Sequence, residues 1–431
     1  MAECWGAWPH RKWFYLAITV LLTALFVVGC QIFSPNRGES DRVVLKLSGW
    51  GASPAEQQIL QQVLQEFRDT HPQLDVRFEV IADQYMDVLT TRLIGDAAAD
   101  VFYLQALEAP FFMANHVLEP LDRYITPEFD LADFEPNLLE PFQYRGQLYG
   151  LPKDFSTLAL FYNRSALAAA GLETPPTTWA ELVDYARQLT IDTNQDGRPE
   201  QYGLGILPDL ARLVYMMTAF GGEIVDANGY ATFASDRSLQ GLELLVNQYL
   251  HDRTAVQPLD VGTNSGTEMF GQGKVAMVIE GNWAIPYLAD TFPELEYATA
   301  EVPQINDQPG TMAYPVAYVM NRQSTHKSEA WELIAYLTGK AGMQRWTSGG
   351  AALPTRRSVA EQLAYDRDPL RAPFIAGANY ATIWQAGNYP TPVMHSFNNQ
   401  FISVLLGEQP LQLAMERAQA AANQQIRAAL E

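Results

Sequence analysis

The stretch VVLKLSGWGASPAEQQILQQVLQEFRDTHPQLDVRFEV, residues 43–80, has the pattern of a strand, a helix and a second strand. An apolar run over 43–47, followed by a turn with two glycines, predicts the first strand. The helix has a strong start signal, with Ser53 as N-cap and Glu56 closing a capping box. Apolar residues alternate with polar ones over 74–80, which predicts a second strand at the spacing of a βαβ unit.

Strand and helix patterns continue to alternate along the chain, which has 431 residues, 48% of them hydrophobic. A capping box of Thr178 and Glu181 begins another helix. Further strands are predicted over 158–162 and 275–279, and helices over 328–338 and 410–430. This alternation predicts an α/β fold with doubly wound sheets, in which ligands bind at the carboxyl ends of strands. The length favours two domains.

The composition argues against several classes of function. A net charge of -21 leaves no basic surface for a phosphate backbone, so nucleic acid is not an expected partner. Motifs of zinc proteases and serine hydrolases are missing, and the six histidines lack metal-ligand spacing. Gly273-Lys274 is not a phosphate loop, because Val275 stands where Ser or Thr would bind Mg²⁺.

The N-terminus reads as a targeting segment. Arg11 and Lys12 precede an apolar run over 13–28, and Val27-Val28-Gly29-Cys30 resembles a bacterial lipobox. We therefore expect a lipoprotein signal peptide over 1–29, a lipid on Cys30 and a polar tether over 30–41. The other cysteine, Cys4, would be removed, so no disulfide is expected. An uncleaved signal anchor is the alternative.

Five groups of short motifs resemble, in order, the extracellular solute-binding proteins of family 1, the maltose-binding-protein-like receptors. The resemblance spans about residues 43–430 and rests on Tyr149-Gly-Leu-Pro-Lys-Asp154 with Leu158-Ala-Leu-Phe-Tyr-Asn163, Ala170-Gly171-Leu172 with Pro175-Pro176 and Thr178-Trp179, Ala99-Asp100-Val101-Phe102, Gly273-Lys274-Val-Ala-Met277 with Glu280-Gly-Asn-Trp283, and Ser328-Glu-Ala-Trp331 with Tyr336-Leu-Thr.

The resemblance implies a two-lobed type II periplasmic binding protein that catalyses nothing and needs no cofactor. Such a receptor captures a carbohydrate, here expected to be a di- or oligosaccharide, and delivers it to the permease of an ABC importer. It is expected to be a monomer held by its lipid on the outer face of the bacterial cytoplasmic membrane. The expected lobes are 42–152 plus 318–353 and 153–317 plus 354–431. The chain is expected to cross between them near 151–155, 317–321 and 352–355.

A sugar site needs aromatic rings for the C–H faces of the sugar and planar polar groups for its hydroxyls. Trp283, after a Gly-Asn turn, matches a stacking tryptophan of the family. Asp154 and Glu280 could accept hydrogen bonds from hydroxyl groups. The full set of predicted ligand residues is Trp283, Trp50, Asp154, Glu280, Tyr103, Gln105, Trp384 and Tyr314.

A polar loop over 192–200 has oxygen-bearing side chains at positions 1, 3 and 5 and glycine at position 6, which suits Ca²⁺. It is half a motif, because Gly203 occupies the twelfth position, and the alternative is a polar turn. The candidate ligands of this structural calcium are Asp192, Asn194, Asp196, Arg198 and Glu200.

Three other functions stay open at this point. A receptor for a non-sugar solute, such as a polyamine, peptide or metal chelate, would have the same fold. A secreted glycoside hydrolase could use a pair among the 49 acidic residues. A structural surface lipoprotein would bind no ligand.

Overall fold

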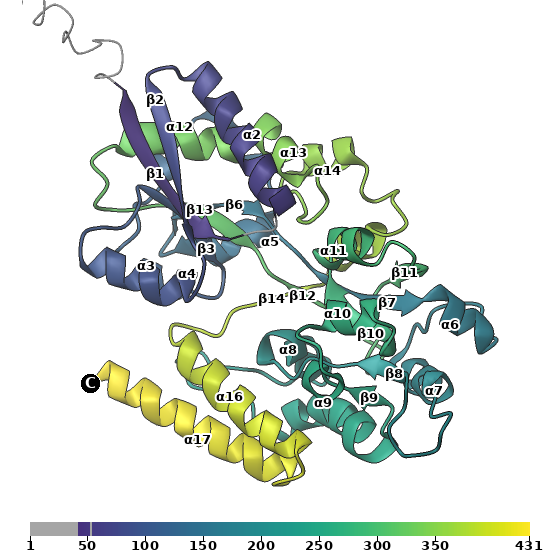
Figure 1. Ribbon diagram of the computed structural model, residues 1–431. Helices are drawn as coiled ribbons and strands as arrows, with labels where there is room; N and C mark the ends of the chain where they lie inside the picture. Colours follow the sequence, from purple (N-terminus) through teal and green to yellow (C-terminus); the bar gives the residue numbers. More distant parts are fainter. Residues whose placement is uncertain (1–41, 52–53) are drawn as a thin grey trace, which may run out of the picture.

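The structure, a computed structural model, describes residues 42–51 and 54–431. It is an α/β protein with two lobes, each built around a five-stranded mixed sheet (Figure 1). The predicted fold class is therefore confirmed. Cys30, the signal peptide and the predicted N-cap Ser53 lie outside the described residues.

In the first sheet, β1 lies between two strands that run parallel to it. One strand, β13, lies between β3 and β6 and runs antiparallel to both. In spatial order its strands are β2 (Leu74–Ile81), β1 (Val43–Trp50), β3 (Val101–Gln105), β13 (Val316–Met320) and β6 (Gly150–Asp154).

The order of these strands reverses at β1. The connection from β1 to β2 carries α2 (Pro54–Thr70), and the connection from β2 to β3 carries α3 (Tyr85–Ile94) and passes to the other side of β1. Because such crossovers are right-handed, the two helices cover opposite faces of the sheet. A reversal of this kind leaves a crevice beyond the carboxyl ends of β1 and β3, where ligands bind in open α/β sheets.

The core of the first lobe lies on both faces of this sheet. From α2 it takes Leu60, Val63, Leu64 and Phe67, which recur at helical spacing and are buried. Helices from late in the chain pack beside α2, as Figure 1 shows. The remaining elements of this lobe are α12 (Lys327–Leu337), α13 (Lys340–Thr347), α14 (Arg357–Leu363), α4 (Ala109–Ala114), α5 (Pro136–Leu139), the strands β4 (Gln143–Tyr144) and β5 (Gln147–Leu148), and the short turns η1 (Asp122–Tyr124), η2 (Pro127–Phe129), η3 (Leu131–Asp133) and η4 (Glu140–Phe142).

The second sheet runs antiparallel on one side and parallel on the other. In spatial order its strands are β11 (Tyr297–Ala300), β7 (Leu158–Asn163), β10 (Val275–Gly281), β8 (Tyr202–Gly205) and β9 (Ala255–Val256). Strand β10 is almost fully buried, as expected of a central strand covered on both faces.

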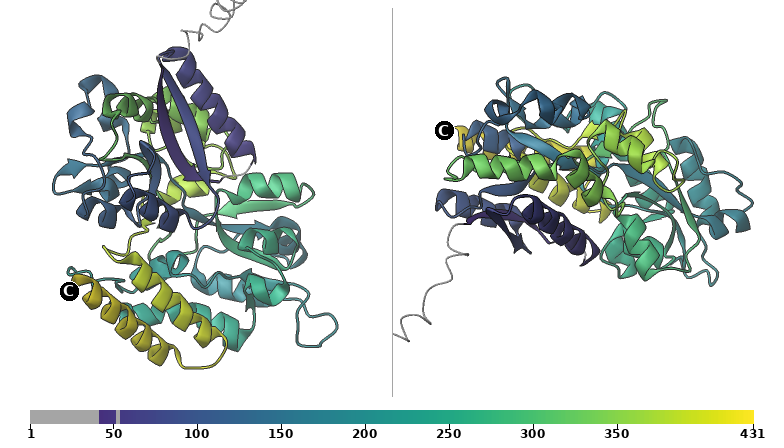
Figure 2. Two further views of the ribbon diagram at one scale, coloured as in Figure 1. Left: turned by 60° about the vertical axis from the view of Figure 1, so that its left-hand side comes forward. Right: turned by 90° about the horizontal axis from the view of Figure 1, so that it is seen from above.

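Helices enclose the second sheet and form one core cluster on each of its faces. The last two helices, α16 and α17, pack side by side at the edge of this lobe in both Figure 1 and Figure 2. The elements are α6 (Arg164–Ala169), α7 (Trp179–Leu189), α8 (Leu210–Thr218), α9 (Asp236–Val246), η5 (Asn247–Asp252), η6 (Pro258–Val261), α10 (Gly266–Gly271), α11 (Ala284–Thr291), α15 (Ala372–Gly377), α16 (Pro390–Leu405) and α17 (Leu411–Leu430).

The chain passes between the sheets at three places. The first passage lies between Asp154 at the end of β6 and Leu158 at the start of β7. The second precedes Val316, so the predicted position at 317–321 falls inside β13. The backbone of 316–320 pairs with both β3 and β6, so this segment belongs to the first sheet and the passage precedes it. A short pair, β12 (Met312–Ala313) with β14 (Thr382–Ile383), lies beside this second passage.

Leu353, in the predicted third passage, lies beside the first passage, because Leu353 and Phe155 pair as an antiparallel bridge. The chain nevertheless stays with the first lobe a little longer. Val359 belongs to the core of the first lobe, and Tyr365 to that of the second. The predicted boundary at 354 therefore precedes the last residues that pack with the first lobe.

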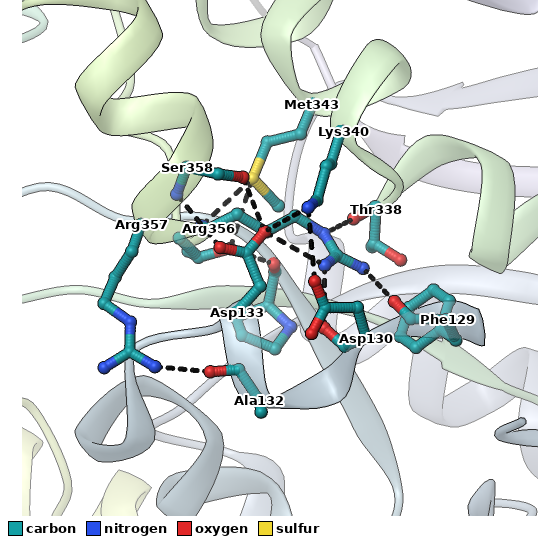
Figure 3. Close-up of polar contacts among 12 residues, drawn as sticks. Phe129, Asp130, Ala132, Asp133, Thr338, Lys340, Met343, Arg356, Arg357 and Ser358 are labelled. Atoms are coloured by element: carbon teal, nitrogen blue, oxygen red, sulfur yellow. Dashed lines mark hydrogen bonds and ion pairs between the residues drawn. The ribbon is translucent and has the colours of Figure 1, made fainter. Parts of the chain in front are cut away.

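Arg356 anchors this segment through a buried polar cluster, drawn in Figure 3. Its side chain is 1% exposed, and its guanidinium donates to the carbonyls of Thr338, Asp130 and Phe129 at 2.7, 2.9 and 3.0 Å. The carboxylate of Asp133 lies 3.3 Å away, and the ring of Phe134 lies 4.1 Å from the guanidinium carbon. A buried arginine is tolerated when its charge is paired and its donors are satisfied, as here.

The elements predicted from periodicity are confirmed within one to three residues. The βαβ unit appears as β1, α2 and β2, and the predicted later strands appear as β7 and β10. Thr178 and Glu181 form the predicted capping box of α7. The two late helices are α12 and α17.

Candidate functional site

A pocket of about 250 Å³ lies where the two lobes meet, at the carboxyl ends of β1 and β3. The reversal of strand order at β1 predicts a crevice at this place. Its lining comes from both lobes and from the first passage between them. The lining residues are Trp50, Glu56, Gln57, Leu60, Phe78, Tyr103, Gln105, Lys153, Asp154, Phe155, Ser156, Trp283, Tyr314, Val316, Trp346, Ala351 and Ala352.

The wall on the first lobe is aromatic. The ring of Trp50 meets those of Tyr85 and Tyr103 edge-on, with centroids 5.3 and 5.2 Å apart. Tyr85 donates its hydroxyl to the Tyr103 carbonyl at 2.8 Å, which joins α3 to β3. A Cβ at Gly49 would lie 2.5 Å from the Tyr103 ring, so this close packing requires glycine there. Burial raises the pKa of the Tyr103 hydroxyl well above its ordinary value, so it stays neutral.

The wall on the second lobe centres on Trp283, which precedes α11 directly after β10. Its side chain is 37% exposed, and its ring centroid lies 6.1 Å from that of Tyr314. A Cβ at Gly281 would lie 2.2 Å from the indole, so the absence of a side chain lets the ring fold back over the strand end. The Tyr314 hydroxyl donates to the Ala211 carbonyl at 2.9 Å, which holds the neighbouring ring in place.

Two charged side chains, Lys153 and Asp154, lie at the base of the pocket. The Lys153 ammonium forms an ion pair with Asp154 Oδ2, and Trp346 Nε1 donates to the same oxygen at 2.5 Å. The ammonium also lies 4.1 Å from the Trp346 ring centroid and 4.7 Å from that of Tyr103. Ser156 donates its hydroxyl to the Asn282 side chain, which connects this base to the turn before Trp283.

Six of the eight predicted ligand residues therefore line one pocket, and these are Trp50, Tyr103, Gln105, Asp154, Trp283 and Tyr314. Their assignment to a ligand remains a prediction. The structure places the other two predicted residues elsewhere.

Glu280 is 1% exposed and does not line the pocket. Its carboxylate pairs with Arg212 at 3.2 Å and accepts the backbone N–H of Gly281 at 3.1 Å. Burial opposes the charge on Arg212, but attraction by Glu280 outweighs it and leaves the pKa of the guanidinium above its usual value. Because Arg212 also lies 5.6 Å from the Trp283 ring centroid, this pair supports the turn that carries Trp283.

Trp384 is 4% exposed and packs in the core of the second lobe, away from the pocket. It directly follows β14, where its backbone N–H donates to the Ala313 carbonyl at 2.9 Å. The apolar sequence around it does not distinguish a core tryptophan from a stacking one.

The loop proposed for calcium forms a compact polar turn. The N–H of Gly197 donates to Asp192, that of Arg198 to Asp196, and that of Thr193 to Glu200, at 3.0, 2.8 and 2.9 Å. These bonds hold the loop as a polar turn, while Asp192 Oδ1 has no hydrogen-bond partner among the described residues. No three acidic, histidine or cysteine side chains within 42–51 and 54–431 lie together as a metal site would require. Calcium binding by Asp192, Asn194, Asp196, Arg198 and Glu200 stays an untested prediction.

A second hollow of about 400 Å³ adjoins the pocket and shares Trp50 and Gln105 with it. Its other lining residues are Gln84, Tyr85, Met86 and Asp87, at the start of α3. We call it the α3 annex. Trp50 therefore lines both the pocket and the α3 annex.

Sequence reasoning did not select several residues that complete the pocket. Lys153 stands inside a motif that was singled out, but a lysine beside an aspartate is more often a solvated surface pair. Trp346 lies on α13, nearly two hundred residues after Asp154, and no local pattern connects the two. Such contacts depend on how distant segments pack.

Within the part of the chain that the structure describes, no helix has the length and apolar character needed to span a bilayer. This finding does not extend to residues 1–41.

Comparisons with known proteins agree with this architecture. The family model described as bacterial extracellular solute-binding protein matches residues 51–344. A binding protein of Brucella abortus is 26% identical over 322 residues, which cover 73% of this chain and 77% of the relative.

Solved structures share the fold over most of the chain. An ABC substrate-binding protein from Listeria monocytogenes in complex with cycloalternan has a TM-score of 0.80 at 20% identity and covers 90% of this chain and 99% of its own. An ABC transporter solute-binding protein from Thermotoga lettingae, bound with α-D-tagatose, has a TM-score of 0.76 at 25% identity and covers 89% of this chain and 99% of its own.

Proposed function

Since this chain belongs to the family of bacterial extracellular solute-binding proteins, we propose that it captures a carbohydrate between its lobes for the permease of an ABC importer. The observation that carries the proposal is the pairing of Trp50 and Trp283 on opposite walls of one pocket, with Asp154 at its base. Indole rings suit the apolar faces of sugar rings, and a buried carboxylate suits their hydroxyls. The Listeria structure holds cycloalternan and the Thermotoga structure α-D-tagatose, which supports the same class of solute.

In the proposed mechanism, the lobes move about the three chain passages and a ligand that touches both walls favours the closed arrangement. A ligand shifts such an equilibrium only by its difference in affinity for the two states. The pocket lining comes from both lobes, so a ligand contacts more of the protein in the closed state and binds that state more tightly than the open one. Closure then forms the surface that docks on the permease. The protein acts as a monomer and catalyses no reaction.

We further propose that Cys30 carries the lipid that holds the protein at the outer face of the cytoplasmic membrane, after removal of residues 1–29. The lipobox-like sequence before Cys30 supports this. Labelling of cells with a palmitate analogue tests it, because the wild-type protein should take up label and remain with membranes. The Cys30→Ser variant should lose both properties, and equal labelling of the two proteins would contradict the lipid anchor.

The test of ligand binding is thermal unfolding of the protein from residue 31 onward. It is measured with mono-, di- and oligosaccharides, polyols, amino acids and polyamines, with and without a chelator. A specific ligand at a hundred times its dissociation constant adds about 2.7 kcal/mol to the free energy of unfolding. We expect a shift with one saccharide or a related series. A shift with amines or peptides alone would contradict the carbohydrate assignment.

A further inference from the structure

Lys153 is a lysine that is 3% exposed, at the base of a pocket that also contains Asp154, Tyr103 and Trp346. A buried ammonium needs a partner to offset its lost hydration. Asp154 supplies the opposite charge, and the rings of Tyr103 and Trp346 lie 4.7 and 4.1 Å from the ammonium. The ammonium is thus held between two aromatic faces and one carboxylate.

A bulge in β6 explains how two consecutive residues reach the same pocket. Successive side chains of a regular strand point to opposite faces of the sheet. Opposite β6, however, Val316 pairs with Asp154 and Ala317 with Pro152, so the register shifts and Lys153 is the extra residue. A β-bulge of this kind redirects a side chain, and bulges are frequent beside functional sites. Here it brings the ammonium next to the carboxylate of its own neighbour.

The ion pair of Lys153 with Asp154 changes the charge that a ligand meets at the base of the pocket. A lone buried carboxylate attracts amines, because an opposite charge is the strongest partner available to it. With Lys153 attached, the two charges cancel at short range, and an incoming cation also meets a like charge. Among the described residues, the two side-chain donors to Asp154 are the Lys153 ammonium and the Trp346 indole N–H, and both bind Oδ2. This arrangement leaves Oδ1 as the atom to accept a ligand hydroxyl.

We propose that Lys153 is the residue that sets the charge class of the ligand, by making the base of the pocket accept a neutral polyol and reject an amine. The inference rests on the proposed function, because it concerns selectivity within the same pocket. It gives Lys153 a role in specificity that is separable from the stacking by Trp50 and Trp283.

The experiment compares neutral sugars with their amino counterparts, by calorimetric titration of the wild-type protein and three variants. The probes are glucose with glucosamine, and cellotriose with the β-1,4-linked trimer of glucosamine, beside any neutral saccharide from the thermal panel and spermidine. The variants are Lys153→Met, Lys153→Arg and the double variant K153M/D154N. Melting without ligand confirms that each variant folds. The double variant has no unpaired buried carboxylate and stays usable if Lys153→Met alone does not fold.

We expect the wild-type protein and Lys153→Arg to bind neutral saccharides at least tenfold more tightly than amines. In Lys153→Met the ratio of the two affinities should fall at least a hundredfold, and in the double variant at least tenfold. An unchanged ratio in a folded Lys153→Met or double variant would overturn the inference. Tighter binding of amines by the wild-type protein would also overturn it and leave a receptor of another class. If no saccharide binds the wild-type protein, the proposed function itself fails.

Discussion

The guanidinium of Arg356 lies 3.3 Å from the carboxylate of Asp133, although 223 positions separate the two residues along the chain. The contact joins the segment before the third passage to the η2–η3 turns of the first lobe (Figure 3). Both residues bond other groups of the same cluster, since Asp133 also accepts from the Ser358 hydroxyl at 2.7 Å.

Arg356→Met should therefore destabilise the protein strongly. It removes the charge and takes the guanidinium donor from the carbonyls of Phe129 and Thr338, while the Asp130 carbonyl keeps the backbone N–H of Asp133. Removal of one partner of a buried, hydrogen-bonded ion pair typically costs about 3–5 kcal/mol. Urea denaturation measures the effect. The neighbouring exposed Arg357 bonds only the Ala132 carbonyl among the described residues, so Arg357→Met serves as the control and should change stability by less than about 1 kcal/mol. Equal losses in the two variants would contradict a special role of the cluster.

Trp283→Ala should weaken binding of the saccharide found in the thermal panel by roughly thirtyfold or more, which corresponds to about 2 kcal/mol for a central aromatic contact. The unliganded protein should melt close to the wild type, because the indole is 37% exposed. The matched control is Tyr287→Ala, an exposed aromatic on α11 that does not line the pocket. Calorimetric titration separates the two. A similar loss of affinity in both variants would point to a general effect on α11.

The α3 annex should determine how affinity depends on the length of the ligand. A saccharide that stacks on Trp50 can continue from the pocket into the annex, where Asp87 offers a carboxylate. Asp87→Trp should fill this space and weaken the longest saccharides of a bound series about tenfold, while the shortest keeps its affinity. Asp83→Ala, an exposed residue outside the lining, is the control and should change neither. Equal weakening at every length would argue against an extended site.

Glu108 should make the protein less stable as pH rises toward neutrality. Burial raises the pKa of its carboxyl from 4.5 to about 7, and its Oε2 has no partner within the described residues. Between these two values the folded state holds more protons than the unfolded state, so the free energy of unfolding falls with rising pH. At about 1.4 kcal/mol per unit of pKa shift, the loss of stability is at most about 3.5 kcal/mol, and partial exposure of Glu108 makes it smaller. Urea denaturation of wild type and Glu108→Gln from pH 4.5 to 8 should show a shallower fall in the variant. Parallel curves would refute this assignment.

The helices and strands could largely be predicted from the sequence, because their signals are local. The capping box of Thr178 and the alternation over 74–80 act within a few residues. The side of the pocket built from strand ends was predictable for the same reason. Trp346, the bulge at Lys153 and the burial of Trp384 depend on contacts between distant segments. Periodicity does not report such contacts.

The place of β13 in the first sheet determines when that sheet can be completed during synthesis of the chain. The strands β3 and β6 flank β13, so each lacks that neighbour until residues 316–320 have been synthesised, more than 150 residues after β6. Until then one edge of β3 is unpaired and β6 has no partner strand, and such edges are prone to pair with other chains. The second sheet has its last strand, β11, by residue 300 and can assemble earlier. The sheet that begins first along the chain is therefore the one that is completed last.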